Sequence, residues 1–252
     1  MAATVIALVA PMNFVLINPG PASPLFPKVV SLKDKEVATY SVNGNLYLLT
    51  IYVTNPETYV SGGMVVGCWV WGKCAVLPRS VMYKKNTTDE KEVAESKKEM
   101  DTSQSVAVTA AKKYLAKKYP EINLSSFDDT SLKVSLKNTG GPSGGLVFTL
   151  GLIDLLTPVD ILQGRKIAGT GTLSDDGAIG PIGGVTEKIL GAKSAGASVL
   201  LVSRENCLDL PHEVTGIEVV AIDTIDAAVA YLLQPAKPLN SAGIHGCASV
   251  GA

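Results

Sequence analysis

The glycine-rich stretch Gly140-Gly141-Pro142-Ser143-Gly144-Gly145 separates two segments with different hydrophobic patterns. Before it, residues 132–136 alternate between apolar and polar side chains, which is typical of a half-buried strand. After it, residues 146–156 form a nearly continuous apolar run that favours a buried helix. The stretch is therefore expected to be a strand-to-helix loop that exposes the Ser143 hydroxyl at the start of a helix.

Strands and helices alternate through the second half of the chain. The expected helices are 145–156, 186–195 and 223–233, and the expected strands are 166–173, 198–203 and 217–222. Such alternation favours an α/β fold of mixed α+β character, in which helices flank a mixed sheet that is at least partly parallel.

The first half is expected to supply strands and then one long helix. Residues 46–53 read as a strand, and the Val- and Trp-rich range 64–77 reads as one or two more. Residues 90–119 follow a helical period that Pro120 ends. The face that this helix should bury comprises Met100, Ser103, Ala107, Ala110, Ala111, Tyr114 and Leu115.

Composition limits the classes of function. The 252 residues are 46% hydrophobic, which is enough for a sizeable core, and the net charge of −1 gives no reason to expect a nucleic-acid partner. The chain divides into an apolar N-terminal segment (1–27), one domain (28–234) and a polar tail expected to be flexible (235–252).

The N-terminal segment has no charged residue before Lys28. Its uncharged part, residues 2–17, is shorter than the roughly 20 residues that span a bilayer. It also lacks the basic start of a signal peptide. Residues 18–22, Asn-Pro-Gly-Pro-Ala, give it a non-helical exit. Two interpretations stay open: a buried strand or helix, and the remnant of a membrane anchor.

The four cysteines, Cys68, Cys74, Cys207 and Cys247, match no zinc-binding pattern. Cys68 and Cys74 lie in a range expected to be strand, where a disulfide between them would need a bend. Free, buried thiols are therefore expected, and no metal or other cofactor is predicted.

A serine hydroxyl needs a neighbouring base to act as a nucleophile. A lysine can be that base when burial lowers its pKa. On the helix that starts near residue 186, Lys188 shares a side with small residues, whereas Lys193 points to the other side. Ser143 and Lys188 are therefore the candidate nucleophile and base of a hydrolase. At the helix start, the backbone N–H groups of Ser143 and Gly144 could hold an oxyanion.

A histidine base is the alternative. The chain has two histidines, and His245 lies in the tail. His212, with Asp209 or Asp160 as its partner, would give a Ser-His-Asp triad and an esterase-like hydrolase.

The residues around Ser143 and Lys188 resemble the proteolytic domain of the Lon protease family. The family has a Gly-Pro-Ser-small-Gly loop, and this chain reads Gly141-Pro142-Ser143-Gly144-Gly145. The family's second block runs from a Thr-Gly pair through Pro-Ile-Gly-Gly to a lysine. In this chain these are residues 170–171, 181–184 and 188. The match is densest over residues 132–206, and most of residues 40–233 fit one such domain.

The resemblance implies a Ser-Lys dyad of Ser143 and Lys188, with Thr170 hydrogen-bonded to the lysine amine. It also implies polypeptide substrates and homo-oligomeric rings, commonly of six subunits. Gly140 and Thr172 replace the Asp and Glu that bacterial Lon enzymes usually carry. Both changes resemble a membrane-anchored branch that lacks the ATPase. On that resemblance the chain is expected to be membrane-associated, with its catalytic domain outside the cytoplasm.

That branch usually carries a PDZ domain, for which the short segment between Tyr119 and Leu132 leaves no room. No Walker-type G-x-x-x-x-G-K-[ST] motif occurs in the sequence. The expected function is an ATP-independent serine endopeptidase that cleaves unfolded or flexible polypeptides. A catalytically silent, Lon-like binding or scaffold protein is the alternative.

Overall fold

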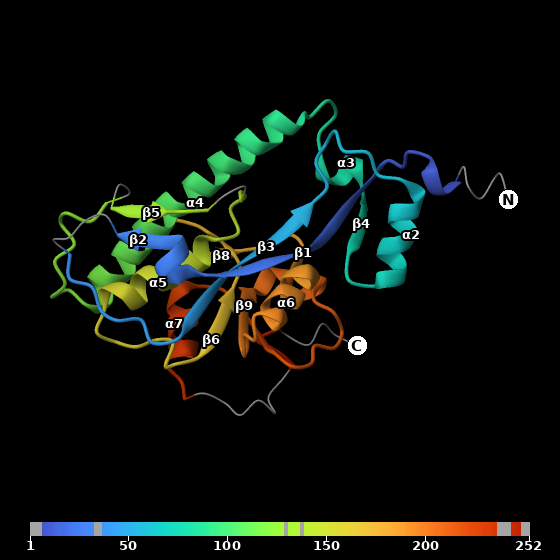
Figure 1. The fold of residues 1–252 in the computed structure, drawn as a ribbon. Coiled ribbons are helices and arrows are strands. Elements are labelled where there is room, and N and C mark those ends of the chain that lie inside the picture. The colour runs from blue at the N-terminus through green and yellow to red at the C-terminus, as the bar shows by residue number, and fades with distance from the viewer. Residues whose placement is uncertain (1–6, 33–36, 129–130, 137–138, 236–242, 248–252) are drawn as a thin grey trace.

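A computed structural model describes residues 7–32, 37–128, 131–136, 139–235 and 243–247. Its centre is a seven-stranded mixed sheet in the order β11-β10-β9-β6-β3-β1-β4 (Figure 1). Neighbouring strands from β3 to β11 are parallel, whereas β1 is antiparallel to both β3 and β4. The strands are β1 (Phe14–Pro24), β3 (Asn45–Val53), β4 (Ala75–Pro78), β6 (Lys166–Gly169), β9 (Val199–Ser203), β10 (Glu218–Ile222) and β11 (Gly243–His245).

Helices cover both faces of this sheet (Figure 1). One core contains side chains of α4 (Asp89–Lys118), α5 (Gly145–Leu156) and α7 (Ile225–Leu232), and the other contains those of α6 (Val185–Ser194). Successive strand residues enter different cores: Leu48 joins the first and Leu49 the second. Because both faces are buried, the parallel strands are apolar along most of their length.

Smaller elements complete the described structure. Two antiparallel pairs, β2 (Val30–Leu32) with β5 (Leu132–Val134) and β7 (Thr172–Leu173) with β8 (Ile179–Gly180), lie outside the main sheet. The remaining helices are α2 (Gly62–Trp71), α3 (Arg79–Met82), η1 (Leu25–Val29) and η2 (Arg204–Asp209). The predicted fold class, a mixed sheet flanked by helices, is confirmed.

Helix α4 matches its prediction closely. It begins after Thr88, whose Oγ1 accepts a hydrogen bond from the Lys91 amide at 3.3 Å, and it ends at Lys118, before Pro120. All seven residues of the predicted inner face are buried. This packing, mainly against α5, holds the long helix over the loop that contains Ser143.

The prediction of strands between residues 64 and 71 is wrong, because this part of the chain is helix α2. Ser61 Oγ accepts a hydrogen bond from the Met64 amide at 3.3 Å, and Gly72 ends the helix in a left-handed conformation with φ 66°. Strand structure resumes only at β4.

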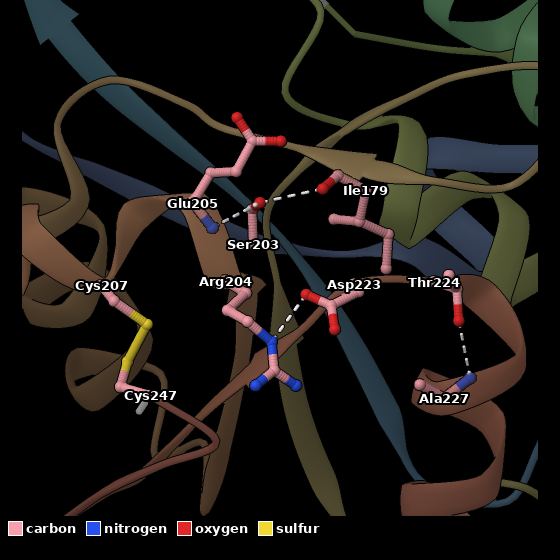
Figure 2. A network of polar contacts seen from close by, with 9 residues as sticks. All are labelled: Ile179, Ser203, Arg204, Glu205, Cys207, Asp223, Thr224, Ala227 and Cys247. Carbon is pink, nitrogen blue, oxygen red and sulfur yellow. Dashed lines mark hydrogen bonds and ion pairs between the residues drawn. A yellow bond between two sulfur atoms is a disulfide. The ribbon is translucent and has the colours of Figure 1, made fainter. Parts of the chain in front are cut away.

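The expectation of free thiols is also wrong. Disulfides join Cys68 to Cys74 and Cys207 to Cys247, with Cα–Cα distances of 5.6 and 5.7 Å. The turn at Gly72 returns the chain to Cys68, which supplies the bend that the first disulfide needs. Cys247 reaches Cys207 because β11 adds to the sheet beside β10, and Figure 2 shows this second bridge.

The N-terminal segment contributes to the centre of the fold. Val15, Leu16 and Ile17 are buried in β1, which corresponds to the buried-strand interpretation. The predicted exit at residues 18–22 continues this strand, with an irregular register between Pro19 and Ala22. None of the helices in the described ranges is both long enough and apolar enough to cross a membrane.

The C-terminal segment is partly ordered into the sheet. Residues 243–245, expected in a flexible tail, form β11 in parallel with β10. Residues 236–242 and 248–252 of that tail lie outside the described residues.

A group of polar contacts joins the ends of β8, β9 and β10 (Figure 2). The buried Ser203 hydroxyl donates to the Ile179 carbonyl at 2.9 Å, and Arg204 pairs with Asp223 at 2.7 Å. Thr224 caps α7 by accepting from the Ala227 amide at 3.2 Å. These contacts fix the carboxyl ends of two parallel strands beside the segment that leads to α6.

Asp154 on α5 is a buried carboxylate with one unsatisfied oxygen. Its Oδ1 accepts from the Ile161 amide at 2.9 Å, whereas Oδ2 has no hydrogen-bond partner among the described residues. Burial raises the pKa of this carboxyl to about 6. The folded state therefore binds the proton more tightly than the unfolded chain, and stability from this group falls as the pH rises from about 4 to about 6.

We expect Asp154→Asn to increase the free energy of unfolding at pH 7 by on the order of 2 kcal/mol, because the amide keeps Oδ1 and carries no charge. Urea unfolding between pH 4 and pH 7 measures the effect, which should shrink toward pH 4. Asp101→Asn, at an exposed position on α4, is the control and should change little. A variant no more stable than the wild type at pH 7 would contradict this interpretation of Asp154.

Candidate active site

Helix α4 fixes the loop that carries Ser143. The Gly141 amide donates to the Ser96 carbonyl at 2.8 Å, and the Ser103 hydroxyl donates to the Pro142 carbonyl at 3.1 Å. Gly141 has a φ of 88°, a conformation that favours glycine. The loop turns sharply into α5, and Ser143 is half-buried immediately before the helix.

Gly144 allows α5 to begin directly after Ser143. A Cβ at this position would lie 2.7 Å from the Phe148 ring, so the site has no room for a side chain without movement of that ring. The backbone N–H groups of Ser143 and Gly144 donate to no other described residue. They lie at the N-terminal end of a helix, where N–H groups and the helix dipole favour negative charge.

Lys188 is buried in the first turn of α6, with 3% of its surface exposed. Burial lowers the pKa of its amine to about 8, because the charged form loses its hydration. Lys193 on the same helix is exposed, as its position on the helix predicts. A substantial neutral fraction of the Lys188 amine is therefore available near pH 8.

Close packing of α6 accounts for this burial. A Cβ at Gly191 would lie 3.0 Å from the Gly20 carbonyl oxygen, so α6 approaches β1 at a distance that only glycine accommodates easily. Gly191 and Ala192 are buried on the same side of the helix as Lys188. The small residues that the sequence places on this side thus allow the amine to lie against the sheet.

Thr170 lies between the lysine and the serine loop. Lys188 Nζ donates a hydrogen bond to Thr170 Oγ1 at 3.2 Å, and that hydroxyl donates to the Ser143 carbonyl at 3.4 Å. The next amide, of Gly171, donates to the same carbonyl at 3.0 Å. Thr170 is fully buried and follows β6 directly. The end of this strand thus brings the amine and the Ser143 backbone into one site.

The Pro-Ile-Gly-Gly segment before α6 is held by Asn206, a contact that the sequence did not reveal. The Asn206 side chain accepts from the Ile182 amide at 3.0 Å and donates to the Ile182 carbonyl at 2.8 Å. Gly184 then adopts φ 67° and starts the helix. Asn206 therefore fixes the approach to Lys188 through the backbone.

A cleft of about 630 Å³ adjoins the serine loop. Pro142 forms part of its wall, together with α4 and β7. Its lining residues are Ala94, Glu95, Lys98, Glu99, Thr102, Ser103, Val106, Pro142, Thr172 and Leu173. The contribution of α4 could not be read from the sequence, because it depends on how the helix crosses the loop.

The alternative histidine base finds no support in the contacts of the described residues. His212 is exposed between η2 and β10, and no hydrogen bond joins it to Ser143. Asp209 accepts from Asn206, and Asp160 accepts from Asn43, each at 2.9 Å. The two carboxylates proposed for a triad therefore have other partners.

Ser143, Thr170 and Lys188 lie within a part of the chain that is similar to known proteins. The model of the Lon protease (S16) C-terminal proteolytic domain matches residues 80–235. The Lon protease of Clostridium beijerinckii is 34% identical over 102 residues, which cover 39% of this chain and 13% of that protein. The Lon protease of Koribacter versatilis is 37% identical over 107 residues, which cover 40% of this chain and 12% of that protein.

Lon protease 2 of Bacillus subtilis is 32% identical over 93 residues, which cover 37% of this chain and 16% of that protein. The aligned segments are thus a small part of these relatives, between 12% and 16% of their length. The family match itself extends over more than half of the present chain. The chain therefore belongs to the Lon protease family and contains its proteolytic domain.

Proposed function

We propose that this chain is a serine endopeptidase in which Ser143 is the nucleophile and Lys188 the general base. The observation that carries the proposal is the buried Lys188 amine, which reaches the Ser143 backbone through the single hydroxyl of Thr170. Family membership supports peptide-bond hydrolysis, and the lowered pKa of Lys188 supports its use as a base.

In this mechanism the neutral Lys188 amine takes the proton of the Ser143 hydroxyl as Oγ attacks the carbonyl carbon of a peptide. The N–H groups of Ser143 and Gly144 hold the oxyanion of the tetrahedral intermediate. The Lys188 ammonium then returns its proton to the departing amine, which leaves an acyl-enzyme. Lys188 next deprotonates a water molecule, whose attack releases the acyl group and restores Ser143.

The substrates we propose are unfolded or flexible polypeptides. The cleft beside Pro142 has room for a few side chains of an extended chain but not for a folded domain. Since the sequence contains no Walker-type motif, we propose that this chain cleaves such substrates without ATP. A homo-oligomer, which the resemblance to the Lon family implies, belongs to the same proposal. Peptide hydrolysis with and without ATP tests the nucleotide requirement directly.

We also propose an extracytoplasmic location for the domain. The two disulfides support it, because stable disulfides are favoured in oxidising compartments. Thiol trapping of the protein directly from cells, followed by mass spectrometry, would find the four cysteines paired. Four trapped free thiols would remove this support.

Labelling tests the nucleophile itself. A fluorophosphonate probe should modify Ser143, and peptide mass spectrometry should locate the adduct on the 140–145 loop. A peptide boronate added beforehand should prevent labelling. Casein hydrolysis measured on the same sample shows whether the labelled site is active. An intact protein that takes up no probe and cleaves no casein would favour the catalytically silent alternative, and an adduct on another serine would overturn the assignment.

Thr170→Val should lower kcat at least about tenfold, because the isosteric valine cannot hold the lysine amine in place. The ammonium form also loses its hydrogen-bond acceptor, so the pKa of Lys188 should fall further and the rising limb of the pH–rate profile should move to lower pH. Thr170→Ser retains the hydroxyl and should restore most activity. Equal losses in both variants, with no change in the profile, would indicate a packing role only.

A further inference from the structure

Helix α2 exposes an unusually apolar surface at the edge of the molecule. Trp69 is 80% exposed, Val70 74% and Trp71 57%, and Met64 and Val66 are also exposed. The helix contains no charged residue. Figure 1 shows α2 beyond β4, far from α5 and α7. Large apolar side chains gathered at the exposed end of one helix usually mark an interaction site.

The N-terminal segment extends this surface. Residue 11 pairs with residue 61, and the Gly62 amide donates to the Ala10 carbonyl at 3.2 Å. Val9, which is 60% exposed, therefore lies beside the start of α2. We define the α2 patch as Val9, Met64, Val66, Trp69, Val70 and Trp71. It lies outside residues 80–235, which the family model matches.

The charged residues along the chain segment that contains α2 are of one sign. Residues 58–88 contain four basic residues, Lys73, Arg79, Lys84 and Lys85, and no acidic residue, although the whole chain has a net charge of −1. Lys73, Lys84 and Lys85 are exposed. Glu57 and Asp89, the nearest acidic residues along the chain, each accept from the other's backbone amide, at 3.1 and 2.8 Å.

The combination of exposed apolar side chains and basic residues fits a lipid surface better than it fits a second copy of this chain. A symmetric dimer would bring the same patch, and the same cations, face to face, where like charges repel. A typical protein partner would also require hydrogen bonds across the interface, for which the patch offers little beyond the indole N–H groups. Tryptophan favours the boundary between acyl chains and headgroups, and flanking cations favour anionic lipids.

We propose that the α2 patch docks on the surface of an anionic lipid bilayer, into which Trp69, Val70 and Trp71 insert. The helix lies in the interface and does not span the bilayer. Binding through one short helix is reversible, and salt weakens it because the cations contribute. The proposal does not depend on the proposed peptidase activity.

The chain provides its own probe, since its two tryptophans are both in α2. Vesicles of equimolar phosphatidylglycerol and phosphatidylcholine should shift the tryptophan emission of the disulfide-bonded protein to shorter wavelength. Brominated acyl chains should quench it. Vesicles of phosphatidylcholine alone should bind at least about tenfold more weakly. No shift with the anionic vesicles, or equal binding to both compositions, overturns the proposal.

A matched pair of variants locates the contact. Val70→Asp should reduce co-sedimentation with anionic vesicles at least about tenfold. Leu208→Asp, at a 78% exposed position on η2, should bind as the wild type does. Circular dichroism checks that both variants fold, and peptidase activity on a soluble peptide should be the same in both. Equal binding by the two variants overturns the assignment to α2.

A second copy remains as a distinct outcome of the same measurements. If the emission shifts without lipid as the protein concentration rises, and light scattering gives a doubling of mass that Val70→Asp abolishes, the patch is a self-association surface and the lipid proposal is wrong.

Discussion

Lys188→Met should reduce peptide hydrolysis by at least about a thousandfold while making the protein more stable. The loss of activity follows because methionine fills the space of the lysine but cannot accept a proton from Ser143. The gain in stability follows because the buried amine has a pKa of about 8, far below that of the same group in the unfolded chain. At pH 7 that difference costs on the order of 3 kcal/mol.

Both the stability and the activity of the wild type should increase as the pH rises. Because the unfolded chain holds this proton more tightly, the stability of the wild type should rise between about pH 8 and pH 10.5, and the variant should lack that rise. The kcat/KM of the wild type should rise with pH through about 8, as the amine becomes neutral. Thermal unfolding and initial rates across this range measure the two effects.

Lys193→Met is the matched control, since it removes an exposed amine from the same helix. It should leave both the rate and its pH profile unchanged. A Lys188→Met enzyme that retains the wild-type rate would show that another group acts as the base. An inactive variant that is also less stable would leave the loss of activity open to a structural explanation. Only the combination of lower activity and higher stability identifies a buried catalytic amine.

The helices and strands that the sequence predicted best are those whose ends carry clear signals. Helix α5 begins and ends at the predicted residues, because the glycine loop fixes its start and its apolar side chains fill the space beside the sheet. Helix α6 was predicted within one residue, and Gly196 follows it as expected. In these elements the local signals and the burial of the side chains favour the same structure.

Helix α2 was missed for a physical reason. Its side chains are apolar on every side, so the segment has no helical period, and Val and Trp favour strands. The signals that could have revealed it are Ser61 and Gly72, which cap its two ends. The Cys207–Cys247 bridge and the contact between Asn206 and Ile182 join residues distant in sequence, so only the folded chain brings them together.

Ser143→Ala should abolish peptide hydrolysis, with a loss of at least about a thousandfold, and should leave thermal stability unchanged. The Ser143 side chain makes no hydrogen bond to another described residue, so its removal breaks no contact that holds the loop. The loop is fixed by Ser96 and Ser103 of α4 and by the Ser143 carbonyl, all of which alanine leaves in place. Activity on a fluorogenic peptide and thermal unfolding are measured on the same preparation.

The double variant Ser143→Ala/Lys188→Met gives the sharper result. If the two side chains act in one proton transfer, removing the second adds almost nothing to the loss caused by the first, because the step they share is already absent. Ser103→Ala is the matched serine control: it removes a buried hydroxyl that holds Pro142 but cannot supply the nucleophile, so it should lower activity only partially. Losses that multiply in the double variant would mean that Ser143 and Lys188 act in separate steps, and the dyad would have to be abandoned.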